Sequence, residues 1–186
     1  MDLFHISYLP IREFHPKIPR NRLDNENDSI PRICLSPFIP CCISAKAGKG
    51  EYIRLSLKDN IPCLLYIYKM ECNEKNILPP DKVMQYGVPD ANLNQEYWLL
   101  SDPVNVEEKI VKVINATFED YDRIEGIEFT ENIEKTDFLF VEFCQRYNEE
   151  VRKSRNTTRK LSYASPEIMM PQMWDDMVRL YRQYKK

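Results

Sequence analysis

The sequence predicts an α+β protein: a single domain with a split, mostly antiparallel sheet and flanking helices. Several short segments alternate apolar and polar residues with a period of two, as half-buried strands do. The near-continuous apolar run Pro62–Met70 is too short for a good helix and indicates a buried strand. Apolar residues at three-to-four-residue spacing after Thr136 indicate helices. We expect residues 1–118 to form a sheet-rich, ligand-binding part and residues 119–186 to add a strand and helices.

The composition is that of an ordinary globular protein, with 43% hydrophobic and 30% charged residues among 186. The formal net charge of −3 argues against nucleic-acid binding through a uniformly basic surface. No segment approaches the roughly 20 apolar residues of a membrane-spanning helix. The start MDLFHISYLP lacks the basic residues of a signal peptide. We therefore expect a cytoplasmic protein with no membrane association.

Cysteine and glycine usage excludes several kinds of site. The six cysteines lie mostly in apolar runs, no C-x-x-C pair occurs, and only His5 and His15 could complete a zinc site. We therefore expect no metal. Four glycines leave no G-x-G-x-x-G or Walker-type phosphate loop. Buried, reduced thiols are expected on the apolar faces, at Cys34, Cys42, Cys63 and Cys144.

The N-terminal part combines a strand with a long loop. Leu3–Ser7 alternates as a strand, with His5 facing away from Phe4 and Ile6. This histidine is either a structural residue or a compact donor for a ligand hydroxyl. The polar, proline-bounded residues 10–31 predict a loop whose positive charge, including Arg22, could meet an anionic ligand. A solvated, variable loop is the simpler interpretation.

The stretch Arg32–Gly50 predicts a strand, a sharp turn and a short helix. Arg32–Ser36 is the strand, Ser36 the predicted N-cap and Pro37 the first helical residue, with Gly48 as the stop. Such a junction presents side chains and free N–H groups to a ligand. Arg32 and Ser36 are therefore candidate site residues, although a plain packing unit would have the same pattern.

The middle of the chain predicts two further extended segments and a loop. Tyr52–Leu57 is expected to be extended, and residues 71–90 to form a surface loop. Glu96–Ser101 predicts a strand with Glu96 at its start. This glutamate either points at a ligand or is an exposed carboxylate at a strand edge.

The C-terminal part predicts strands followed by helices. Val106–Phe118 and Arg123–Thr130 have strand patterns. A helix is expected from about Thr136, although its start, DFLFVEF, could instead be a strand. The last helix is expected to start around Ser165-Pro166 or after Pro171, with a basic loop at 152–160 before it.

Taken in order, these features resemble the ADP-ribosyltransferase-like superfamily. In that family a His or Arg on the first strand, a Tyr, Ser or His ending a second strand, and a Glu on a later strand line one NAD-binding cleft. His5, Ser36 and Glu96 take these places here. The segment EYWLLSDPVNVEEKI is similar to the closing strand and turn of the RNA 2′-phosphotransferase branch. KIPRNRL and PRICLSPFI are similar to segments of an uncharacterised family of phage and Gram-positive bacterial proteins.

The resemblance implies a protein that binds NAD, as substrate, or a related nucleotide. It also implies transfer of ADP-ribose to a macromolecular acceptor, a host protein or a nucleic acid. Glu96 and Ser36 would be catalytic, and His5, Arg32 and Arg22 would bind the nucleotide. A phage-encoded protein of this kind would act in the host cytoplasm. The oligomeric state is not determined by the sequence.

Two other classes stay open because no catalytic motif of high specificity occurs. One is a non-catalytic, phage-encoded inhibitor or nucleotide-sequestering protein that acts against host defence. The other is a structural or host-interaction module with Trp98 and Trp174 as contact anchors. Release of nicotinamide from NAD would distinguish the enzyme from both.

Overall fold

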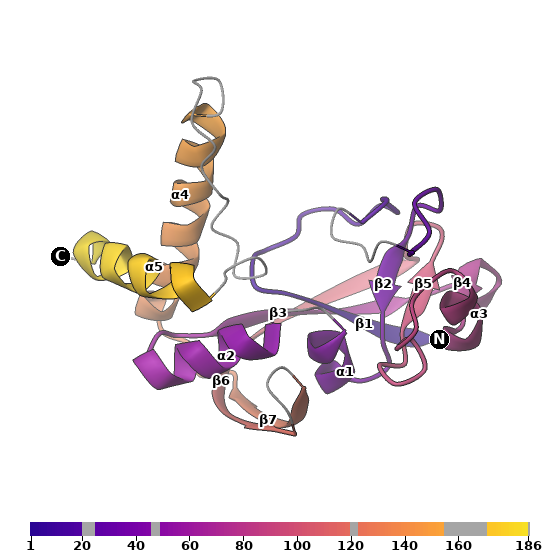
Figure 1. The fold of residues 1–186 in the computed structure, drawn as a ribbon, viewed down its shortest axis with the longest axis horizontal. Helices are drawn as coiled ribbons and strands as arrows, with labels where there is room; N and C mark the ends of the chain where they lie inside the picture. Colours follow the sequence, from indigo (N-terminus) through magenta and orange to yellow (C-terminus); the bar gives the residue numbers. More distant parts are fainter. Residues whose placement is uncertain (20–24, 46–48, 120–122, 155–170, 186) are drawn as a thin grey trace. The chain divides into compact units, whose positions relative to one another are not determined.

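The computed structural model describes residues 1–19, 25–45, 49–119, 123–154 and 171–185 (Figure 1). They cluster into two compact units: one from Met1–Ala45 and Tyr66–Lys109, the other from Lys46–Leu65 and Ile110–Lys186. Arg22, Gly48 and most of the predicted basic loop 152–160 lie outside the described residues.

The described chain is mixed α+β, with antiparallel strand pairs and helices. One sheet has the order β1-β3-β6-β7 and the other β2-β5-β4. The strands are β1 (Asp2–Ser7), β2 (Ile33–Leu35), β3 (Leu64–Glu71), β4 (Ile77–Leu78), β5 (Tyr97–Leu99), β6 (Asn105–Phe118) and β7 (Ile124–Thr130). The α-helices are α1 (Ile39–Ser44), α2 (Lys49–Asp59), α3 (Pro80–Gln85), α4 (Leu139–Ser154) and α5 (Pro171–Tyr184). Two short 3-10 helices are η1 (Glu74–Asn76) and η2 (Lys135–Phe138).

The first unit is built on antiparallel pairs between β1 and β3, β2 and β5, and β4 and β5. A bridge between Phe4 of β1 and Ser36, just after β2, joins the two sheets. Beside β5, buried Trp98 packs with Val83, Val88 and Ala91 in one apolar cluster. The ends of β1, β2 and β5 are therefore held together by backbone pairing and by a packed core.

The second unit combines the β6–β7 hairpin with α2, α4 and α5. Tyr52 of α2 stacks on Phe140 of α4 with ring centroids 6.4 Å apart, and Trp174 of α5 lies edge-on to Tyr52 at 5.7 Å. Lys112 of β6 pairs with Asp137 at 2.7 Å. Asp137 also accepts the backbone N–H of Glu134, which caps η2. Packing between buried aromatic side chains and the capped start of η2 thus stabilise this unit.

Most predicted strands are confirmed, with ends shifted by one or two residues. Leu3–Ser7 lies within β1, Arg32–Ser36 contains β2, and Pro62–Met70 overlaps most of β3. Glu96–Ser101 contains β5, and Val106–Phe118 lies in β6. The other predicted strand, residues 123–130, contains β7, and helices occur at both C-terminal positions.

Three local predictions are wrong. Tyr52–Leu57 lies inside α2, because the helix buries Tyr52, Ile53 and Ser56 on one face. The segment 71–90 is no simple surface loop, since it holds η1, β4 and α3. Helix α1 begins at Ile39 with Phe38 as N-cap and no side-chain cap bond, so Ser36 does not cap it.

Candidate functional site

The three residues predicted to share a site lie where β1, β2 and β5 meet in the first unit. The backbone N–H of Phe4 donates to Ser36 O at 2.8 Å, and that of Ser36 donates to Phe4 O at 3.0 Å. This bridge brings the end of β2 to the strand that carries His5. On its other side β2 pairs with β5, placing Cys34 opposite Trp98. The pairing thus brings His5, Ser36 and Glu96 into one region.

His5 is fixed by the backbone of the neighbouring strand. Its Nδ1 lies 3.0 Å from the carbonyl oxygen of Cys34. Because a carbonyl only accepts, Nδ1 donates the proton of this contact. Phe14, from the loop after β1, lies edge-on to the imidazole at 5.6 Å and also contacts Tyr68 at 4.8 Å. The half-buried ring is therefore held in one orientation.

Ser36 is buried, and its hydroxyl holds two distant segments together. Its Oγ donates to the carbonyl oxygen of Asn94 at 3.1 Å. The backbone N–H of Phe38 lies 3.4 Å from the same Oγ, which accepts it. The hydroxyl thus ties the segment that leads from Asn94 to Glu96 to the end of β2.

Glu96 is only 8% exposed, so its carboxyl group is largely removed from water. Its Oε1 accepts the indole N–H of Trp98 at 2.8 Å. Burial is the main cause that raises the pKa of Glu96, and the negative charges of Glu26 and Asp90 add to it. Hydrogen bonds from Trp98 and from the Cys34 thiol act in the opposite direction. The carboxyl group is therefore held between effects that favour its neutral and its ionised form.

Cys34 adds a protonated thiol to this cluster. Burial raises the pKa of Cys34 well above its usual range, and the Glu96 carboxylate raises it further. The sulfur therefore keeps its proton and donates it toward Glu96. Cys34 links the two sides of the region, because its carbonyl binds His5 and its side chain binds Glu96.

Arg32, predicted to bind a nucleotide, is engaged inside the protein. Its guanidinium forms an ion pair with Glu26 and donates to the carbonyl oxygen of Ile30 at 2.8 Å. The same group lies over the indole of Trp98, 3.8 Å from the ring centroid. Its side chain is fully buried. Arg32 therefore meets a carboxylate and an aromatic face of its own chain, rather than an open surface.

Sequence reasoning missed three residues that contact the predicted ones. Trp98 could have been recognised, because residues two apart on a strand share a face and Glu96 precedes it by two. Glu26 and Cys34 had no comparable signal. Their contacts depend on a loop conformation and on strand register, which are set by the tertiary fold.

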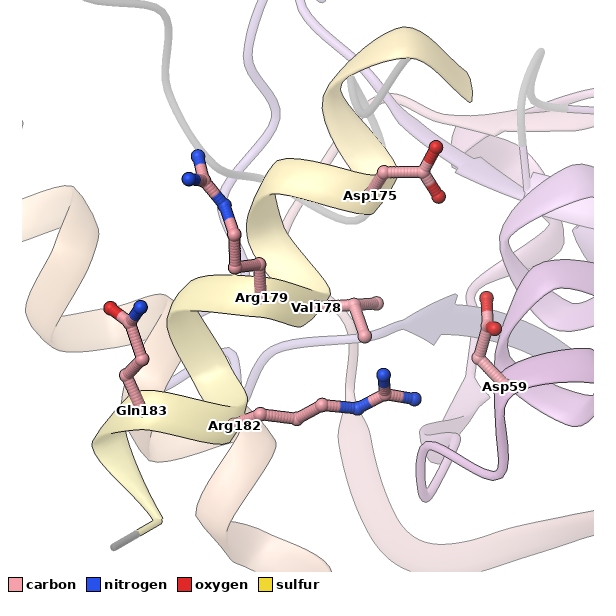
Figure 2. Close-up of a pocket in the computed structure, with 6 residues that line it drawn as sticks. All are labelled: Asp59, Asp175, Val178, Arg179, Arg182 and Gln183. Carbon is pink, nitrogen blue, oxygen red and sulfur yellow. The ribbon is translucent and has the colours of Figure 1, made fainter.

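A separate hollow, about 410 Å³ in volume, lies in the second unit along α5 (Figure 2). Its lining residues are Asp59, Asp175, Val178, Arg179, Arg182 and Gln183. Figure 2 shows the Arg182 side chain extending from α5 toward Asp59 of α2. Asp59 also accepts the indole N–H of Trp174 at 2.6 Å. The hollow shares no residue with the cluster around Glu96.

No family profile, curated protein or solved structure matches the chain. Within the described ranges, no group of three or more His, Cys, Asp or Glu side chains is placed to hold a metal ion. None of the helices in those ranges has the length and apolar character needed to cross a membrane. The site must therefore be interpreted from its own geometry.

Proposed function

We propose that this chain is an ADP-ribosyltransferase-like protein that binds NAD or a related nucleotide where β1, β2 and β5 meet. The observation that carries the proposal is the convergence of His5, Ser36 and Glu96, residues far apart in the sequence. They are connected through Cys34, whose carbonyl binds His5 and whose thiol binds Glu96. The bridge from Phe4 to Ser36 completes the connection. Three residues that follow the family's order along the chain would seldom also lie in one region if they had only unrelated structural roles.

The proposed chemistry is cleavage of the bond between nicotinamide and ribose. The bonding electron pair leaves with nicotinamide, so positive charge develops on the ribose ring. An ionised Glu96 beside the ring would stabilise this charge, and the acceptor nucleophile would form the new bond to the ribose while losing its proton. His5 and Ser36 would hold the nucleotide in a reactive orientation. Arg22, outside the described residues, keeps its proposed role toward the pyrophosphate.

The direct test is incubation with NAD and measurement of nicotinamide release. Glu96→Gln keeps the size of the side chain and removes its charge, so we expect release to fall by at least about 100-fold while NAD binding persists. Glu128→Gln is the matched control, because Glu128 is an exposed glutamate on β7. Equal release by the wild type and Glu96→Gln would refute the catalytic role of Glu96.

A second candidate function is nucleotide sequestration without catalysis, as in an inhibitor directed against host defence. The observation that favours it is the internal engagement of Arg32 and Glu96, which both have partners within the protein. Calorimetric titration with NAD separates the two functions. Binding with intact NAD after prolonged incubation supports sequestration, whereas binding with nicotinamide release supports transfer.

A further inference from the structure

Trp98 lies between the carboxyl group of Glu96 and a buried cation. Glu96 and Trp98 lie on one face at the start of β5, and the indole is fully buried. The indole N–H donates to Oε1 of Glu96 at 2.8 Å. An indole nitrogen only donates, so this contact fixes one carboxylate oxygen as an acceptor.

The position of the indole is itself fixed by charged and aromatic neighbours. The Arg32 guanidinium lies 3.8 Å from its ring centroid, within the range of a cation–π contact. Glu26 holds that guanidinium through an ion pair. Tyr86 stacks against the same indole with centroids 5.8 Å apart and planes at 27°. The indole therefore has little freedom to turn its N–H away from Glu96.

We propose that Trp98 is a positioning residue for Glu96: held by Arg32 and Glu26, its N–H fixes the carboxylate and favours its ionised form. This inference rests on the proposed function, because it assigns Trp98 to the carboxylate that would stabilise the ribosyl cation. A hydrogen bond donated to an ionised group is worth more than one to a neutral group, so it favours the charged state. Trp98 thereby offsets part of the effect of burial.

The groups that face Glu96 come from several segments. Cys34 of β2 donates its thiol proton, and Trp98 donates from β5 itself. The carboxylates of Glu26, in the loop before β2, and Asp90, after α3, oppose ionisation. Arg32 does not face Glu96 directly, because its guanidinium lies over the Trp98 ring. Among these groups, removing the Trp98 donor has a predictable direction: the pKa of Glu96 must rise.

The test is Trp98→Phe, which keeps an aromatic ring and removes the N–H. Carbon-detected NMR titration of the Glu96 carboxyl should show its midpoint moving to higher pH. Nicotinamide release should lose about 10- to 100-fold in kcat, the factor expected for one hydrogen bond to a charged group, with KM for NAD nearly unchanged. Trp174→Phe is the matched control: it removes an indole N–H that donates to Asp59 rather than to Glu96 and should leave the Glu96 titration midpoint in place. An unchanged midpoint in folded Trp98→Phe overturns the proposal.

A second measurement does not depend on the folding of that variant. In the wild-type protein the Trp98 indole N–H resonance should titrate with the midpoint of the Glu96 carboxyl, and Glu96→Gln should abolish this titration. Independent midpoints overturn the positioning role. The failure of the proposed function looks different, because the coupled titration would persist while NAD released no nicotinamide.

Discussion

Gly87 provides a sharp test of how the loop before β2 is held. It follows α3 with φ of +92°, a conformation that residues with a Cβ rarely adopt. A Cβ built at this position would overlap the carbonyl oxygen of Asn25 and would lie 2.9 Å from Cα of Glu26. Both are backbone atoms, which cannot rotate away as a side chain does. Gly87→Ala should therefore displace the backbone that presents Glu26 to Arg32.

The expected loss can be estimated from two terms. Left-handed backbone costs an alanine about 1–2 kcal/mol, and forcing a methyl group into packed atoms costs about 1–3 kcal/mol. Their sum predicts a loss of about 2–5 kcal/mol in the free energy of unfolding. Gly126→Ala is the control, because its added Cβ would lie 2.8 Å from the rotatable hydroxyl of Thr117. We expect that change to stay within about 1 kcal/mol.

The assay is urea denaturation of both variants, followed by far-UV circular dichroism. Equal slopes with a lowered midpoint for Gly87→Ala would show a loss of stability without a change in the surface exposed. A loss below about 1 kcal/mol for Gly87→Ala, or equal losses for both variants, would refute the argument from backbone contact. It would mean that the segment at Asn25 and Glu26 moves without cost.

Three further predictions follow from buried polar groups. Asp59→Ala leaves the Trp174 indole N–H without its acceptor and should lower the free energy of unfolding by about 1–3 kcal/mol; Asp59→Asn, which keeps an acceptor oxygen, should lose less in the same denaturation assay. Burial raises the pKa of Glu96 above its ordinary 4.5. Its stabilising contribution is therefore complete below pH 4.5 and is lost as the pH rises through the folded value. Glu96→Gln should flatten the fall of stability with pH in that window, and an unchanged slope would contradict this. Burial also raises the pKa of Cys144 to about 12, and that of Cys63 as well. Both thiols should react with a bulky disulfide reagent only on unfolding, and rapid labelling of the native protein would count against their burial.

The sequence alone predicted the β-rich half well, because alternation along a strand is a property of the local backbone. Leu3–Ser7 and Pro62–Met70 were found from their patterns, and both correspond to observed strands. The same alternation places Glu96 and Trp98 on one face, so their hydrogen bond was accessible to sequence reasoning. His5, Ser36 and Glu96 were candidates from their places in the predicted elements, and the resemblance assigned them to one site. Their convergence required the fold.

Tertiary contacts decided what local pattern could not. Tyr52–Leu57 has the alternation of a strand, yet packing of Tyr52 on Phe140 and Trp174 stabilises a helix there. Ser36 has the sequence context of an N-cap, but its hydroxyl donates to Asn94, 58 residues away. Arg32 has the positive charge that an anion-binding residue needs, but the fold buries its side chain against Glu26. In each case local preferences differ by about 1 kcal/mol or less. Burial of an aromatic side chain or pairing of a buried charge outweighs such a difference, and the partner is known only when the chain has folded.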